Sequence, residues 1–369
     1  MSNLNDYLKQ NKNITFLTKK VNVLDILLMS QIALLDFDKV MLVKSNRCPF
    51  TMKKLSRDYF SQVYYPDKTL GLMIGSSNIS GFKELAESRR FQDIKLSDYI
   101  NIVNPTEEIQ ISAVTAHINN KKYIIFSGTD DSVVGWKENF DMLHKRATPS
   151  QKYAVSYVEY IASKYPGAIV LVGHSKGGAD AMYAGVHVND RVFKKIVKIY
   201  CFDAPSIISD DKFSDQFLSR VKKIESYIPD MSIVGRIYYH KEKTYIVKSE
   251  SLGICQHNPY TWQNNGDDFL YCKKLDPDSD KIDKVVKNLV NNMTLDEKIA
   301  FTNEFANLFK KSHITNLIDV TKRKTRLFVN YFRIPVTKRA AFYKPIRKLL
   351  INKYIRYAIL NTYRGIRKK

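Results

Sequence analysis

Residues 168–178, AIVLVGHSKGG, decide the fold, because a continuous apolar run leads directly into a turn rich in glycine. An uninterrupted apolar run of this kind is typical of a strand buried on both faces of a parallel sheet. The segment that follows, ADAMYAGVHV, has the small and apolar residues of a helix. The stretch therefore predicts a strand, a sharp turn at Ser175 and a helix.

The surrounding sequence repeats this alternation of strand and helix. Two β-rich runs, IQISAVTAHI and KYIIFSG, flank Asn119-Asn120-Lys121 and predict a hairpin. Helices are expected over WKENFDMLHKR and SQKYAVSYVEYIASKY, and further strands over 194–202 and 220–228. A second hairpin is expected from RIYYH and TYIVK, a buried helix over 21–39, and amphipathic helices over 279–311. The alternation from 108 to 228 predicts an α/β sheet with helices on both faces.

Composition limits the class of protein. With 44% hydrophobic and 12% aromatic residues the chain of 369 residues is not disordered. Residues 310–369 hold 18 Lys and Arg side chains and one acid, Asp319, so this segment carries +17 of the net charge of +22. The high charge therefore indicates a basic C-terminal appendage rather than nucleic-acid binding by the whole protein. Cys48, Cys201, Cys255 and Cys272 have no C-x-x-C spacing and predict reduced thiols rather than a zinc site.

The candidate nucleophile is Ser175. Residues 173–177, GHSKG, match the G-x-S-x-G pattern of a nucleophile elbow, in which the serine stands on a sharp turn between a strand and a helix. At the helix N-terminus, backbone N–H groups can stabilise an oxyanion. The alternative is an ordinary serine that caps the helix.

A serine nucleophile needs a histidine and an acid later in the chain. His257 lies on a loop after the last predicted strand, which is where such a base belongs. The other candidates are less well placed: His187 lies on the helix that leaves the elbow, His240 is at a predicted hairpin tip, and His313 adjoins the basic tail.

Two acids compete. Asp203 follows the first strand after the elbow, and Asp230 follows the second. The usual position of the acid favours Asp230, with Asp203 as the alternative. For an oxyanion hole we expect the backbone N–H of Lys176 and a second donor from residues 126–129, where Thr129 offers an N–H and a hydroxyl.

These motifs resemble a known family. IIFSGTDDSVVGWKENFDM resembles the F-R-G-T region of class 3 lipases, with Ser127 where arginine is usual, and VLVGHSKGG resembles their elbow. The sequence is more similar still to uncharacterised bacterial lipase-like proteins, which share the G-H-S-K-G-G elbow, F-D-x-P at 202–205, Y-[IV]-P-x-x-S-x-V-G at 227–235 and Q-H-x-x-x-x-W at 256–262.

The resemblance implies an α/β-hydrolase fold with a mostly parallel central sheet. It also implies a triad of Ser175, Asp230 and His257, with Thr129 and Lys176 at the oxyanion hole. The implied activity is hydrolysis of acyl esters, as in an esterase, lipase or phospholipase. An acyl-enzyme mechanism of this kind requires neither a metal nor a cofactor. The alternative function is that of an inactive hydrolase-fold protein that binds a membrane or nucleic acid.

The domain organisation follows from the same signals. We expect a mixed N-terminal segment over 1–107, the hydrolase core over 108–275, its C-terminal helices over 276–311 and a basic helical tail over 312–369. Basic residues and aromatics intermix throughout this tail, which favours docking on an anionic membrane. Packing on the protein's own body and nucleic-acid binding are the alternatives. The aromatics are Phe328, Tyr331, Phe332, Phe342, Tyr343, Tyr354, Tyr357 and Tyr363.

The N-terminus has no apolar signal region, and no window is long enough to cross a bilayer. We therefore expect a cytoplasmic protein or one bound peripherally to a membrane, with export by a route that needs no signal peptide as the alternative.

Overall fold

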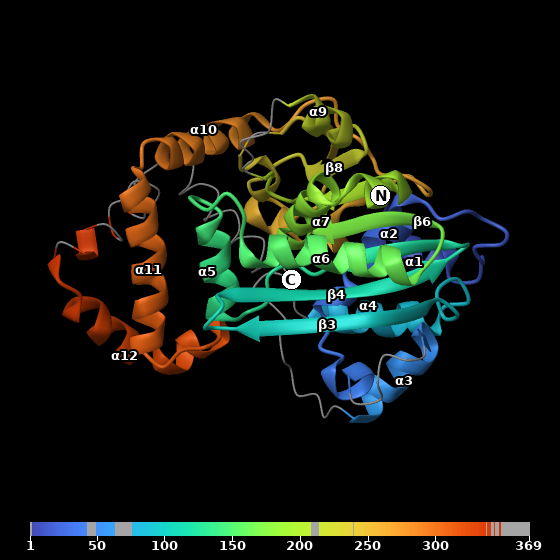
Figure 1. The fold of residues 1–369 in the computed structure, drawn as a ribbon, viewed down its shortest axis with the longest axis horizontal. Helices are drawn as coiled ribbons and strands as arrows, with labels where there is room; N and C mark the ends of the chain where they lie inside the picture. The colour runs from blue at the N-terminus through green and yellow to red at the C-terminus, as the bar shows by residue number, and fades with distance from the viewer. Residues whose placement is uncertain are drawn as a thin grey trace.

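The computed structural model describes residues 2–42, 49–62, 76–207, 214–238, 240–336, 338–340, 343 and 347. An eight-stranded sheet in the order β2-β3-β4-β5-β6-β7-β8-β9 crosses this part of the molecule (Figure 1). Its strands are β2 (Phe50–Thr51), β3 (Lys95–Asn104), β4 (Ile109–Ile118), β5 (Lys121–Phe126), β6 (Ala168–His174), β7 (Ile196–Phe202), β8 (Ile224–Pro229) and β9 (Lys243–Val247). From β2 to β5 neighbouring strands are antiparallel, and from β5 to β9 they are parallel.

Twelve helices surround the sheet in the described residues. They are α1 (Leu4–Asn11), α2 (Val23–Ser30), α3 (Met52–Gln62), α4 (Ser76–Glu87), α5 (Val133–Asp141), α6 (Pro149–Lys164), α7 (Lys176–His187), α8 (Asp190–Lys195), α9 (Asp215–Val221), α10 (Pro277–Asn291), α11 (Leu295–Lys311) and α12 (Val320–Arg333). A short pairing of β1 (Ser2–Asn3) with β10 (Gln263–Asn264) ties the N-terminus to the body. Among the described helices, none is long and apolar enough to cross a membrane.

The order of the strands explains the layers. Each parallel strand from β5 to β9 lies on the same side of the one before it, so right-handed crossovers place the connecting helices on one face. A core that includes residues of α6, α7, α8 and α9 fills that face. The other face is covered by α1, α2, α3 and α4, whose apolar residues form a second core with the sheet. The chain thus has the α/β-hydrolase fold, with a mostly parallel sheet between two helical layers.

A buried ion pair holds the N-terminal layer together. Arg90 contacts Asp25 through two bonds, Nε to Oδ1 at 2.8 Å and Nη2 to Oδ2 at 2.6 Å, and neither side chain is exposed. The Tyr7 hydroxyl donates a third hydrogen bond to Asp25. Because a bidentate pair fixes orientation as well as distance, it locks α1 and α2 against the end of α4.

The first predicted hairpin is present and the second is wrong. Asn119 and Asn120 have φ values of 45° and 62°, the left-handed pair that a two-residue turn between β4 and β5 requires. The described residues of RIYYH form no strand, because Arg236 ends a 3₁₀ turn over Val234–Arg236, and TYIVK lies largely in β9, which pairs in parallel with β8. Hydrogen bonds from Ser232 and Gly235 to Asp203 hold the preceding chain in this turn, so it does not extend into a strand.

Smaller differences concern the ends of elements. The buried helix expected over 21–39 is shorter, because α2 ends at Ser30. Residues at the start of 194–202 and of 220–228 belong to α8 and α9, and the strands begin after them. Cys201, Cys255 and Cys272 form no disulfide, while Cys48 and the predicted tail helix beyond residue 347 lie outside the described residues.

Candidate active site

The strand, turn and helix around Ser175 have the geometry of a nucleophile elbow. β6 ends at His174, α7 begins at Lys176, and Ser175 between them has a φ of 57°, which is rare for a residue with a side chain. Its backbone N–H donates to Phe202 O at 2.9 Å, which fixes the turn to the end of the neighbouring strand. The Ser175 side chain makes no capping hydrogen bond to α7, contrary to the alternative interpretation of it as a helix cap.

The glycines around Ser175 are required by close packing. A Cβ on Gly173 would lie 2.0 Å from Gly177 O, and a Cβ on Gly177 would lie 2.3 Å from Phe126 O. On Gly178 it would lie 2.4 Å from Ala204 Cβ. These distances leave no room for side chains, so the G-H-S-K-G-G pattern is a consequence of how tightly α7 approaches β5 and β7.

The structure pairs His257 with Asp203. His257 Nδ1 lies 2.6 Å from Asp203 Oδ2, and both side chains are buried. Asp203 stands directly after β7 with a φ of 41°, and its Oδ1 accepts from Ser232 Oγ at 2.5 Å and from Gly235 N at 3.0 Å. Burial alone would raise the pKa of Asp203, but the bond and charge of His257 and the Ser232 hydroxyl outweigh it and lower that pKa.

The structure therefore places the alternative acid, Asp203, beside His257, and not Asp230, which the sequence favoured. Asp230 Oδ1 accepts instead from Gln256 Nε2 at 2.8 Å. Gln256 also receives a bond from Met231 N and donates to Ser251 O. Burial raises the pKa of the Asp230 carboxyl, and Asp276 adds to that effect. Asp230 thus fixes the side chain of Gln256, the residue before His257, rather than the imidazole itself.

The imidazole ring of His174 packs against that of His257. The two rings lie 4.6 Å apart between centroids, and His174 Nε2 is 2.9 Å from His257 O. A carbonyl can only accept, so His174 carries its proton on Nε2. Burial first, and the neighbouring His257 second, lower the pKa of His174 to about 3, so that this ring stays neutral beside the candidate base.

The predicted oxyanion donors lie on two elements that meet at Ser175. Lys176 is the first residue of α7, and the N–H groups of a first helical turn have no partner within the helix. A Cβ on Gly128 would lie 3.3 Å from His174 O and 3.5 Å from Ser175 Cβ, so the loop after β5 touches the elbow. Thr129, the next residue, has its Oγ1 2.8 Å from the Nδ2 donor of Asn139 in α5.

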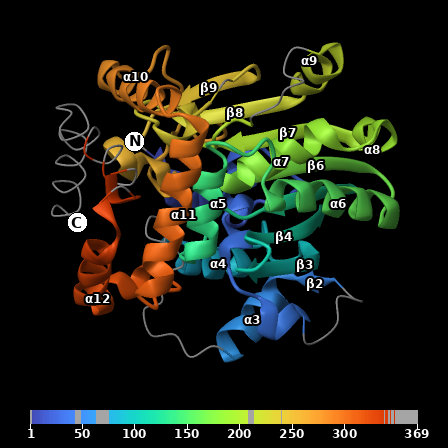
Figure 2. The same ribbon diagram turned by 60° about the vertical axis from the view of Figure 1, so that its left-hand side comes forward.

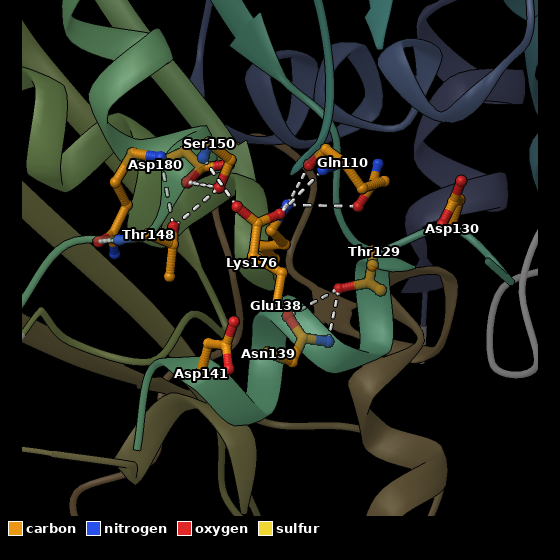
Figure 3. Close-up of polar contacts among 12 residues, drawn as sticks. Gln110, Thr129, Asp130, Glu138, Asn139, Asp141, Thr148, Ser150, Lys176 and Asp180 are labelled. Carbon is orange, nitrogen blue, oxygen red and sulfur yellow. Dashed lines mark hydrogen bonds and ion pairs between the residues drawn. The ribbon is translucent and has the colours of Figure 1, made fainter. Parts of the chain in front are cut away.

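The side chain of Lys176 has a separate role that the sequence did not indicate. Its ammonium lies 2.7 Å from Glu138 Oε2, with both groups buried, and it also donates to Gln110 O (Figure 3). Glu138 accepts in addition from Gln110 N and Ser150 N at 3.0 and 2.7 Å. The Lys176 side chain thus ties the elbow to α5, β4 and the start of α6.

Asp180, one turn further along α7, belongs to the same buried cluster. Ser150 Oγ donates to Asp180 Oδ1 at 2.9 Å, while Oδ2 has no hydrogen-bond partner among the described residues. Burial raises the pKa of Asp180 to about 7, although Lys176 acts in the opposite direction. Figure 3 shows this carboxylate and Ser150 on the side of Lys176 away from Thr129 and Asn139.

The three other histidines considered as candidates for the base lie elsewhere. His187 stacks on Tyr183 within α7, His240 Nδ1 lies 2.5 Å from Glu242 Oε1, and His313 follows α11. Sequence reasoning missed Ser232 and Gly235 as donors to Asp203, although both stand in the motif at 227–235. A Cβ on Gly235 would lie 2.5 Å from Asp203 Oδ1, which explains the glycine. In the motif at 256–262, Trp262 Nε1 donates to Gln256 O at 2.7 Å and so fixes the histidine loop.

Taken together, Ser175, His257 and Asp203 stand at the carboxyl ends of adjacent strands or on a loop bonded to them. Among the described residues, no hydrogen bond joins Ser175 Oγ to His257, whose Nδ1 is bonded to Asp203; bonds between a nucleophile and its base often tighten only when substrate binds. The arrangement provides a strained, half-buried serine, a histidine whose Nδ1 faces a carboxylate, and N–H donors at a helix start. These are the components of nucleophilic acyl transfer.

Comparison with solved structures finds lipases at low similarity. The Lip2 lipase from Yarrowia lipolytica is 15% identical over 53% of this chain and 74% of that chain, with a TM-score of 0.33. The M37 lipase is 16% identical over 51% and 70%, also at 0.33. A triacylglycerol lipase from Penicillium expansum is 11% identical over 49% and 74%, at 0.32. At these values the similarity carries no argument about this chain's activity.

Comparison with families is more decisive. No curated protein matches the sequence. The family model described as Mbeg1-like matches residues 85–309, which is more than half of the chain. That range contains Ser175, Asp203, His257 and the loop before α5, and the chain therefore belongs to the Mbeg1-like family.

Proposed function

We propose that this protein is a serine hydrolase that cleaves carboxylic acyl esters, with Ser175 as nucleophile, His257 as base and Asp203 as the orienting acid. The observation that carries the proposal is the 2.6 Å contact between His257 Nδ1 and Asp203 Oδ2, next to a serine held in a strained turn. A contact of this kind sets the tautomer in which Nε2 is free to accept a proton.

The mechanism follows from these positions. His257 Nε2 accepts the Ser175 proton as Oγ attacks the ester carbonyl, and Asp203 stabilises the imidazolium. The Lys176 N–H and a donor of Thr129 bind the oxyanion. His257 then gives the proton to the leaving alcohol, and the acyl group remains as an ester on Ser175. A water activated by His257 hydrolyses that ester, which releases the acid and restores the serine.

For the substrate we propose a lipid ester, and a phospholipid in particular. The support is the resemblance of the elbow and of the segment around Thr129 to lipase motifs. Residues on the exposed face of α12, described below, add an apolar and basic surface suited to lipid.

The test is labelling with a fluorophosphonate probe in the presence of phosphatidylcholine vesicles that contain about one third phosphatidylserine, with the labelled peptide mapped by mass spectrometry. The wild-type protein is expected to be labelled at Ser175, and Ser175→Ala to be unlabelled. Ser163→Ala is the matched control, because Ser163 is an exposed serine on α6 whose hydroxyl donates to Tyr160 O within the same helix. A folded wild-type protein that resists labelling would overturn the proposal and favour a binding protein with an inactive hydrolase fold.

A further inference from the structure

We propose that α12 is a docking surface for an anionic phospholipid membrane. In this arrangement Phe328 and Phe332 enter the interface, and basic side chains beside them contact lipid phosphates. The proposal does not depend on catalysis, because none of these residues belongs to the candidate active site.

One side of α12 anchors the helix to the protein. Val320, Leu327 and Tyr331 fall on one stripe at helical spacing and pack against a small apolar core formed with α11. Asn330 Nδ2 donates to Lys311 O at 3.0 Å and to Ser312 Oγ at 3.1 Å. Figures 1 and 2 show α12 next to α11, on the side of α11 away from the sheet. The helix is therefore held in a fixed orientation.

The opposite side exposes large apolar groups. Phe328 is 65% exposed, Phe332 51% and Val329 42%, and beyond the helix Val336 is 73% exposed. The two phenylalanine rings contact each other with centroids 4.7 Å apart. At 100° per residue, Phe328, Phe332 and Val329 fall in one sector of the helix, which includes threonine positions and no charged residue. Large exposed apolar side chains gathered in one uncharged sector mark an interaction surface, and we call this group the apolar sector.

Basic residues border this apolar sector. Lys322, Arg326 and Arg333 lie along one edge at helical spacing, and Lys324 lies beyond the other. Within the described part of the chain, Lys324, Arg326 and Arg333 have no acidic partner, and all four are exposed. A basic amphipathic helix with phenylalanine on its apolar side is typical of interfacial binding to anionic lipid.

A groove next to the helix adds a place for a phosphate. It lies between the end of α11 and α12 and is lined by side chains that include Lys311, His313, Arg326 and Arg333. Three permanent cations and a histidine around one open groove suit a phosphate head group. The groove adjoins Val329, so a lipid seated there keeps its head group in the groove and its chains beside the apolar sector.

The charged and apolar residues of this surface together favour a membrane over the chain's own C-terminal segment and over a nucleic acid. Residues 340–369 contain nine Lys and Arg and no acid, so the chain's own C-terminal segment is not complementary to a basic surface. A nucleic acid would match the charge but leaves the exposed Val329 and Val336 unexplained. A membrane accounts for both the aliphatic and the basic residues.

The experiment is co-sedimentation of the full chain with vesicles of phosphatidylcholine, with and without about one third phosphatidylserine. We expect binding only to the anionic vesicles, and weaker binding at high salt. Phe328→Ser/Phe332→Ser and Arg326→Glu/Arg333→Glu should each lower the partition coefficient at least tenfold. Ser175→Ala should bind as the wild type does, which separates this proposal from the catalytic one.

Matched controls change the same chemistry elsewhere on the surface. Leu17→Ser/Leu252→Ser removes two exposed apolar side chains, and Lys83→Glu/Lys152→Glu makes the same change of charge on α4 and α6. Both controls should keep wild-type binding. The proposal is overturned if the phenylalanine variant, folded by its thermal transition, binds like the wild type. It is also overturned if wild-type protein prefers an RNA or DNA oligonucleotide and ignores the vesicles.

Discussion

Replacing Asp203 with asparagine isolates the orienting role of the carboxylate. Oδ1 of Asp203 accepts two hydrogen bonds, from Ser232 Oγ and Gly235 N, whereas Oδ2 faces His257 Nδ1. The asparagine carbonyl is therefore expected to keep the position of Oδ1, and its NH₂ group to face the imidazole. His257 must then accept at Nδ1 and carry its proton on Nε2, where it cannot take the proton of Ser175.

The expected loss follows from that change of tautomer. The same substitution in a serine protease triad lowers kcat by about 10⁴, which corresponds to about 5.5 kcal/mol of activation free energy. Asp230→Asn is the matched control, because Asn keeps the acceptor oxygen that Gln256 Nε2 needs. We expect the hydrolysis rate of that variant to stay within about threefold of the wild type, because the neutral amide oxygen replaces a half-buried carboxylate oxygen and keeps the hydrogen bond from Gln256.

The assay is hydrolysis of p-nitrophenyl butyrate, with the rate of fluorophosphonate labelling as a second readout that needs no turnover. Thermal unfolding of both variants checks that the fold is intact. If Asp203→Asn stays within tenfold of the wild type while Asp230→Asn loses most activity, the assignment of the acid is refuted.

Three further predictions concern stability and use urea or thermal unfolding. Lys176→Met leaves Glu138 buried without its cation and should lower the free energy of unfolding by about 3–5 kcal/mol. The double variant Lys176→Met/Glu138→Gln should recover part of that loss. Equal stability of the single and double variants would contradict a buried ion pair. Gly177→Ala forces a Cβ against Phe126 O and should cost at least about 2 kcal/mol, so an unchanged melting temperature would disprove the packing argument. Because the pKa of His174 is about 3 in the native state, only the unfolded state gains this proton below pH 6.5; lowering the pH from 7 to 5 should cost about 2 kcal/mol through this group, and His174→Gln should lack that component.

Local patterns predicted the parts of the fold that depend on neighbours in sequence. The apolar run before Gly173, the Asn119-Asn120 turn and the helix after Pro149 each act through local geometry, and all three are present. The second hairpin failed because the chain after β8 is bent by bonds to Asp203, a residue about thirty positions earlier. Long-range contacts of this kind leave no periodic signal in the sequence.

The sequence favoured Asp230, whereas the structure places Asp203 beside His257, and the difference has a geometric reason. Asp203 directly follows β7, which pairs with β6, and Ser175 N donates to the carbonyl oxygen of Phe202, the residue before Asp203. Asp230 follows β8, a further strand away, and strands are spaced by about 4.8 Å. Chain order alone does not distinguish the two acids. The Ser232 hydroxyl and the Gly235 N–H both donate to the Asp203 carboxylate, and recognising that these two motif residues bind a carboxylate could have favoured Asp203.

The C-terminal segment and the candidate oxyanion loop are physically joined, and this decides how the tail must be tested. Val133 N donates to Thr315 O at 2.8 Å, and Leu317 N donates to Asp131 O at 2.8 Å, so the chain leading into α12 pairs with the segment just after Thr129. Truncation before this pairing would remove partners of the oxyanion loop together with the proposed membrane surface. A loss of hydrolysis after truncation would therefore not distinguish anchoring from damage to the site. Substitutions on the exposed side of α12, such as Phe328→Ser/Phe332→Ser, leave these backbone bonds in place and therefore separate docking from catalysis.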